Sequence, residues 1–137
     1  MSRRIDVVLG HAPIGLAAIL LLLLAGCGGH WGREEAQALV TTIGAARITG
    51  AVESLRTVVK AQKVAVPESQ WPQVIKELKP KNVYVDGDGV WVAMRSGYIE
   101  GEGLLVIFPG GKEPEEHWGD PSLWRVGKRV FWYSFTG

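Results

Sequence analysis

The turn motif DGDG at positions 86–89 constrains the fold of this chain most, because a short β-rich run lies on each side of it. The run VYV precedes the motif and VWV follows it. Aspartate and glycine are favoured in tight turns between antiparallel strands, so the pattern predicts a β-hairpin. A calcium loop of the EF-hand type would need more ligands at fixed offsets, and Val90 and Trp91 occupy the next positions.

The rest of the second half of the chain is also rich in strand-forming residues. The stretch GLLVIF at 103–108 is apolar throughout, which predicts a central strand covered on both faces. The preceding GEG at 101–103 indicates a turn. LWRV at 123–126 and VFWY at 130–133 predict a final strand or hairpin. Short connections between these runs favour an antiparallel meander of about four strands.

The first half of the chain is predicted to be helical. Apolar residues recur from 33 to 62 at the spacing of one helical face, and Glu34 and Glu35 suit the positive end of the helix dipole. A break near Thr49-Gly50 is an alternative, but no proline or turn cluster interrupts the segment, so we expect one long helix. A short helix is expected from Pro67 to residue 78. The predicted fold class is therefore α+β, with a long N-terminal helix and a short helix packed on the sheet in two layers.

The N-terminal segment has the composition of a targeting signal. Two arginines at positions 3 and 4 precede an apolar run that is densest from 14 to 25. The run ends in Leu24-Ala25-Gly26-Cys27, and Cys27 is the only cysteine in the chain. An uncleaved membrane helix, which needs about 20 apolar residues, and an ordinary secretory signal are the alternative interpretations.

The four residues at 24–27 resemble the lipobox of bacterial lipoproteins. The resemblance implies that residues 1–26 are a signal peptide, that the Cys27 thiol carries the lipid, and that the mature protein is anchored in the bacterial cell envelope, facing the periplasm or the cell exterior. It leaves 27–32 as a short tether and 33–137 as a single small domain. Gly28 follows Cys27, so by the same resemblance no inner-membrane retention signal is present.

The charge balance of the mature chain limits its partners. The full chain has 15 basic and 14 acidic residues, and removal of Arg3, Arg4 and Asp6 leaves the two signs balanced. Nucleic acid binding and polybasic attachment to lipid headgroups both require clustered Lys and Arg, so neither is expected. The membrane is expected as a partner through the lipid anchor.

The acidic stretch before His117 is the one candidate for acid–base chemistry. Glu116, His117 and Asp120 lie close together in sequence, with Glu113 and Glu115 nearby. A zinc site usually needs three or four protein ligands, and this stretch has no His/Cys pair at ligand spacing. A solvated loop is the favoured interpretation, so we assign no catalytic residue, metal or cofactor.

Six tryptophans are many for 137 residues. In a strand, successive side chains point to opposite faces, so Trp91 should lie opposite Val90 and Val92. Tyr84, Trp91 and Trp132 could then form an exposed aromatic binding surface. The favoured alternative is that the tryptophans fill the core of a small domain.

Three functional hypotheses follow. The first is a binding or structural module whose partner is an envelope protein or the cell wall. The second is a hydrolase of envelope material that uses the 113–120 acid/histidine loop. The third is an immunity-type or inhibitor lipoprotein. The first is preferred, and no named family is expected for the mature domain.

Overall fold

The computed structural model describes residues 31–58, 63–96 and 100–137. These residues belong to one compact unit, Trp31–Gly137. The predicted signal segment 1–26, Cys27 and residues 28–30 of the tether lie outside the described residues. Within the described part of the chain, every helix is too short or too polar to cross a membrane.

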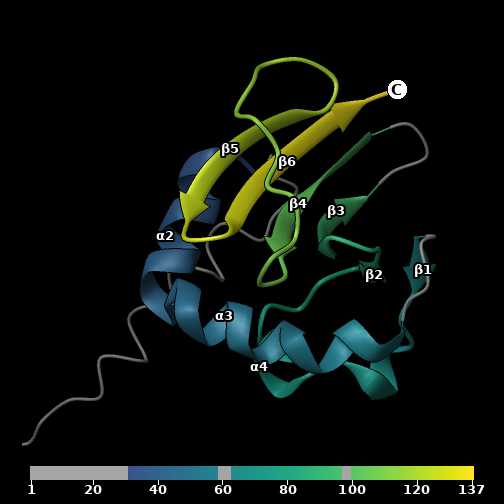
Figure 1. Ribbon diagram of the computed structural model, residues 1–137. Helices are drawn as coiled ribbons and strands as arrows, with labels where there is room; N and C mark the ends of the chain where they lie inside the picture. The colour runs from purple at the N-terminus through teal and green to yellow at the C-terminus, as the bar shows by residue number, and fades with distance from the viewer. Residues whose placement is uncertain (1–30, 59–62, 97–99) are drawn as a thin grey trace, which may run out of the picture. The chain divides into compact units, whose positions relative to one another are not determined.

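The predicted α+β class is confirmed, but the sheet is larger than expected (Figure 1). It has six antiparallel strands instead of about four. The strands are β1 (Val64–Ala65), β2 (Asn82–Val85), β3 (Gly89–Ser96), β4 (Glu100–Ile107), β5 (Ser122–Gly127) and β6 (Val130–Thr136). The difference arises because residues 64 and 65, which precede the second helix, add an edge strand, and because the last β-rich segment forms a complete hairpin.

The strand order is β1-β2-β3-β4-β6-β5, so the expected simple meander is wrong at its end. β4 pairs with β6, and β5 lies at the edge beyond β6. The connection at 108–121 is long enough to carry the chain across the sheet before β5 begins. Figure 1 shows this connection crossing the sheet on the side away from α2.

The predicted hairpin at DGDG is confirmed. Val85 and Val90 are register partners at the closed end of β2 and β3. Asp86 holds the turn, because its Oδ1 accepts the backbone N–H groups of Asp88 and Gly89, both at 2.9 Å. An aspartate that bonds to backbone N–H groups two and three residues ahead is a common stabiliser of turns.

The expectation of one long N-terminal helix is wrong. The segment forms α2 (Arg33–Ile43), α3 (Ala45–Val52) and the 3₁₀ helix η1 (Glu53–Val58). Gly44 separates the two α-helices with φ of 96°, a conformation that side chains with a Cβ rarely adopt.

The break lets the two helices pack in different places. α2 packs on β5 and β6, whereas α3 packs on α4 (Gln73–Glu77) and β4. The corner fits tightly against Gly127 of β5. A Cβ at Gly127 would lie 2.8 Å from Val40 Cγ1 and 2.9 Å from the Ala45 Cβ. The helix bend at Gly44 therefore requires glycine at position 127, because a side chain there would clash with Val40 and Ala45.

The short second helix is present in two pieces, the 3₁₀ helix η2 (Glu68–Gln70) and α4. Ile75 and Leu78 are buried in the core, as the apolar pattern requires. Trp71 is half-buried between the pieces, and its indole N–H donates to the Val66 carbonyl at 2.8 Å. Pro72 directly precedes α4, where its missing N–H group costs no helical hydrogen bond.

The sheet has an apolar cluster on each face. The larger one lies on the helix side and includes Leu104 and Val106 of β4. The smaller one, on the other side, contains Leu105, Ile107, Leu123, Phe131 and Tyr133. β4 is thus covered on both faces, as its continuous apolar sequence predicted.

The expected turn at GEG is instead part of β4. Glycine is needed there because the Val92 carbonyl of β3 and aromatic rings of β6 lie directly against the strand. A Cβ at Gly103 would lie 2.8 Å from the Tyr133 hydroxyl oxygen, and one at Gly101 would lie 2.5 Å from Phe135 Cε1. The stacked rings of Tyr133 and Phe135 replace the side chains that these positions lack.

Two glycine substitutions should separate the effect of the helix break from that of helix propensity. A Cβ at Gly44 or Gly50 would meet no described atom within 4 Å, so neither substitution creates a clash. Gly44→Ala forces alanine into the φ of 96° and should lower the unfolding free energy by about 1–3 kcal/mol. Gly50→Ala, inside α3, should raise it by up to about 1 kcal/mol. Equilibrium urea unfolding measures both, and equal effects of the two changes would contradict this account.

Candidate functional site

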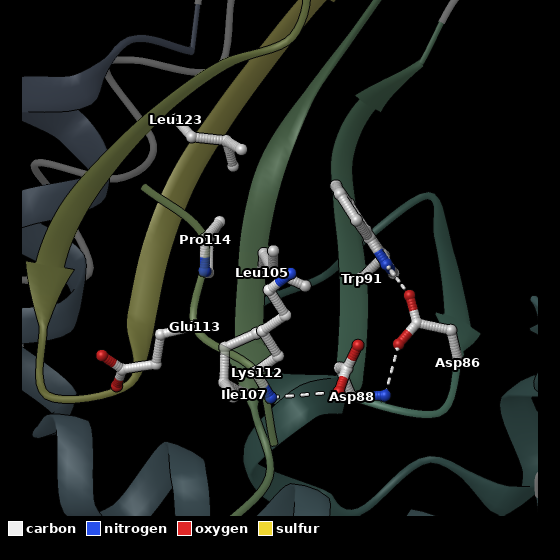
Figure 2. Close-up of a pocket in the computed structure, with 9 residues that line it drawn as sticks. All are labelled: Asp86, Asp88, Trp91, Leu105, Ile107, Lys112, Glu113, Pro114 and Leu123. Carbon is white, nitrogen blue, oxygen red and sulfur yellow. Dashed lines mark hydrogen bonds between the residues drawn. The ribbon is translucent and has the colours of Figure 1, made fainter. Parts of the chain in front are cut away.

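An open groove of about 270 Å³ lies on the sheet face opposite the helices. Its floor is aliphatic and consists of Leu105, Ile107 and Leu123. Trp91 of β3 and Pro114 of the 108–121 connection lie on either side of Leu105 (Figure 2). The floor is therefore built by the central strands, and one wall is built by the connection that crosses them.

Trp91 is held from three directions. Its indole N–H donates to Asp86 Oδ2 at 2.6 Å, as Figure 2 shows. Its ring meets the edge of Tyr133 with centroids 5.0 Å apart. The Lys63 ammonium lies 4.5 Å from the Trp91 ring centroid, within the range of a cation–π interaction. The half-buried indole thus has a fixed orientation before any ligand arrives.

Lys63 joins the two aromatic residues of the hairpin. Its ammonium also lies 5.1 Å from the ring centroid of Tyr84. Desolvation lowers the pKa of Lys63, and the charge of Asp86 opposes that shift by raising it. On the buried side of the same cluster, burial raises the pKa of Tyr133, with the Tyr84 hydroxyl as a smaller cause. Tyr133 therefore stays a neutral phenol under ordinary conditions.

The wall formed by the 108–121 connection is tied down at its start. The backbone N–H of Lys112 donates to Asp88 Oδ1 at 3.0 Å, and the N–H of Phe108 donates to the Asp88 carbonyl at 2.9 Å. Glu113 forms an ion pair with Arg125 at 2.7 Å. The hydrogen bond from Arg125 lowers the pKa of Glu113, so the pair stays charged at neutral pH. The groove thus has a defined wall.

The structure brings together two of the three predicted aromatic residues. Tyr84 and Trp91 are cross-strand partners on the face away from the helices. Trp132 does not share this surface. Its register partner is Leu104, its side chain is 4% exposed, and it belongs to the core on the helix side.

The acid/histidine residues do not converge on one another. The Glu116 carboxylate accepts the backbone N–H of Arg125 at 2.7 Å, and the Asp120 carboxylate accepts that of Thr136 at 3.1 Å. His117 Nδ1 lies 2.9 Å from the Glu115 carbonyl oxygen. These bonds hold the connection to its neighbours. Among residues 31–58, 63–96 and 100–137, no group of three or more His, Cys, Asp or Glu side chains is arranged to hold a metal ion.

Of the residues that line the groove, sequence reasoning proposed only Trp91 as part of a binding surface. It missed Asp86 as the partner of Trp91, and it missed Pro114 and Lys112 of the connection. It also missed Lys63, which lies outside the groove lining but contacts the Trp91 ring. The contact of Asp86 with Trp91 could have been predicted from the sequence. Asp86 begins the turn and Trp91 lies near the start of the next strand, so a hairpin brings the two residues close together. The other three depend on long-range packing, for which the sequence carries no local pattern.

The two aspartates of the turn should respond differently to loss of charge. In Asp86→Asn one side-chain oxygen becomes an NH₂ group, which cannot accept the Trp91 N–H while the other oxygen holds the turn. The unfolding free energy should fall by about 1–3 kcal/mol, and the Trp91 fluorescence should shift. Asp88→Asn keeps its acceptor oxygen and should change stability by less than about 0.5 kcal/mol. Urea unfolding and fluorescence spectra test both, and an unperturbed Asp86→Asn would contradict the assigned bond.

Comparisons with known proteins find no relative of this chain. No protein-family model, no curated protein and no solved structure matches it. Its function has to be inferred from the residues described above.

Proposed function

We propose that this protein is a lipid-anchored binding module of the bacterial cell envelope. In this proposal Cys27 is acylated after removal of residues 1–26, and the domain that follows binds an envelope protein in the groove beside Trp91. The observation that carries the binding assignment is the fixed, half-exposed indole of Trp91 next to an open aliphatic floor.

Anchoring is supported by the position of the single cysteine. Cys27 follows an apolar run and two small residues, and the compact unit begins at Trp31, only four residues later. A thiol directly between an apolar segment and a folded unit is where a lipid attachment site of this kind would lie. The domain itself keeps no other cysteine, so thiol chemistry elsewhere would not compete.

The groove is supported as a binding site by its rigidity and composition. Aromatic anchors surrounded by apolar residues contribute most of the binding energy in protein interfaces. Side chains that are already fixed lose little conformational entropy when a partner binds. Trp91 meets both conditions, because Asp86, Tyr133 and Lys63 hold it beside Leu105.

The chemistry of the groove favours a protein segment over a glycan of the cell wall. Leu105, Ile107 and Leu123 form a floor of aliphatic side chains, which suits an apolar side chain of a partner. A sugar would need several polar groups converging on its hydroxyls. Four charged residues line the groove, but Asp86 is engaged by the Trp91 indole and Glu113 by Arg125. Asp88 and Lys112 are exposed to solvent and would contribute to orientation more than to affinity.

The anchor is tested by the intact mass of the protein extracted from membranes. We expect a chain that begins at Cys27 and carries acyl groups. Cys27→Ala should lose the acyl mass and the membrane association together. An unmodified full-length chain that stays in the membrane would show instead that the apolar N-terminal segment is the anchor, and would contradict the lipoprotein assignment.

The groove is tested by photo-crosslinking in cells. A photoreactive residue replaces Lys112, whose side chain lines the groove, or Lys76, an exposed residue of α4, as the matched control. We expect one envelope protein to crosslink to position 112 and not to position 76. Trp91→Ala should abolish this adduct, whereas Trp91→Phe should keep much of it. Identical adducts from both positions, or an adduct insensitive to Trp91→Ala in a variant that remains folded, would contradict binding in the groove.

A further inference from the structure

The first residue of the compact unit is fixed to the sheet. The backbone N–H of Trp31 donates to Glu102 Oε2 at 2.8 Å, and the Trp31 carbonyl accepts the indole N–H of Trp132 at 3.1 Å. Glu102 lies in β4 and Trp132 in β6, which are neighbouring strands. The chain therefore enters the domain at a defined place beside these two strands.

An exposed aromatic cluster lies next to this entry point. Trp118 is 66% exposed, more than any other large hydrophobic side chain in the described part of the chain. Its ring centroid lies 4.9 Å from that of Trp124 and 6.3 Å from that of Trp132. Trp132 thus contacts both Trp31 and Trp118. We refer to Trp118, Trp124 and Arg33 as the Trp118 patch.

Arg33 completes the patch with a positive charge. Its guanidinium carbon lies 5.9 Å from the Trp118 ring centroid and 5.1 Å from that of Trp124. Arginine stacked on aromatic rings keeps its N–H groups free to meet phosphate oxygens. Two indoles and one guanidinium on a surface match the interfacial zone of a bilayer, where tryptophan is enriched.

The length of the tether places a limit on the distance to the lipid. Four peptide units join Cys27 to Trp31, and a fully extended chain of this length spans roughly 14 Å. The headgroup zone of one leaflet is itself about 5–7 Å deep. An acylated Cys27 would therefore hold the entry point, and the patch beside it, within one or two side-chain lengths of the lipid headgroups.

We propose that the Trp118 patch is seated in the headgroup region of the membrane that holds Cys27. This inference rests on the proposed lipid anchor and adds an orientation to it. Trp118 inserts its indole among the headgroups, and Arg33 meets lipid phosphates. This seating explains why the large apolar ring of Trp118 is exposed beside the point where the chain enters the domain, since such exposure is unfavourable in water.

The test uses the mature lipidated protein, residues 27–137, in phospholipid vesicles that contain a lipid with a nitroxide on its headgroup. A thiol-reactive fluorophore is attached at Gly119→Cys, where a new Cβ would meet only His117 Cδ2, at 3.5 Å. The matched control is Ser69→Cys, an exposed residue of η2. η2 follows β1 at the opposite edge of the sheet from β5. An acylated Cys27 does not react with the fluorophore, and intact mass confirms the acylation.

We expect the nitroxide to quench the fluorophore several-fold more strongly at position 119 than at position 69. Adding Trp118→Ala and Arg33→Gln should clearly reduce the quenching at position 119. Equal quenching at both positions in an acylated protein would overturn the seating and leave the anchor intact. Quenching at 119 that survives the two substitutions would also overturn it, since the tether alone would set the distance. A chain without acyl groups would refute the anchor and the seating together.

Discussion

The burial of β4 on both faces is the constraint on which the rest of this structure depends. Residues 101–108 are all buried, with Leu104 and Val106 toward the helices and Leu105 and Ile107 toward the other side. Such a strand needs cover from two layers. α2 to α4 supply one, and the 108–121 connection supplies part of the other by crossing the sheet (Figure 1). The same crossing carries β5 beyond β6 and leaves the groove between Pro114 and Trp91.

The parts of the fold that depend on neighbouring residues could be predicted from the sequence. The DGDG hairpin and the central position of β4 follow from turn chemistry and from a continuous apolar run. The helix break could not be placed, because Gly44 and Gly50 look alike in sequence. The bend at Gly44 goes with a long-range contact, because Val40 and Ala45 on either side of it pack closely on Gly127. The order of β5 and β6 likewise depends on a long connection whose path has no local signal.

In the candidate site, too, local sequence patterns predicted some features, whereas features set by long-range packing could not be predicted. The period of two along a strand placed Tyr84 and Trp91 on one face correctly. It could not place Trp132, because all four residues of VFWY are apolar and either face could be the inner one. Pairing with Leu104 settles the register and turns Trp132 toward the helices. The position of Lys63 could not be predicted. Its contacts with the rings of Tyr84 and Trp91 join segments that share no sequence motif.

The groove and the Trp118 patch draw on different faces of the sheet. Trp124 and Trp132 pack with the helix-side core, whereas Leu105, Ile107 and Leu123 belong to the opposite cluster. The 108–121 connection is common to both surfaces, but separate bonds hold its two ends. Its start is tied to the β2–β3 turn through Asp88, and its end to β6 through Asp120 and Thr136. A surface held in this way can contact a membrane at one end and a partner at the other without either displacing the other. In the proposed arrangement, anchoring and binding are therefore separable properties of one compact domain.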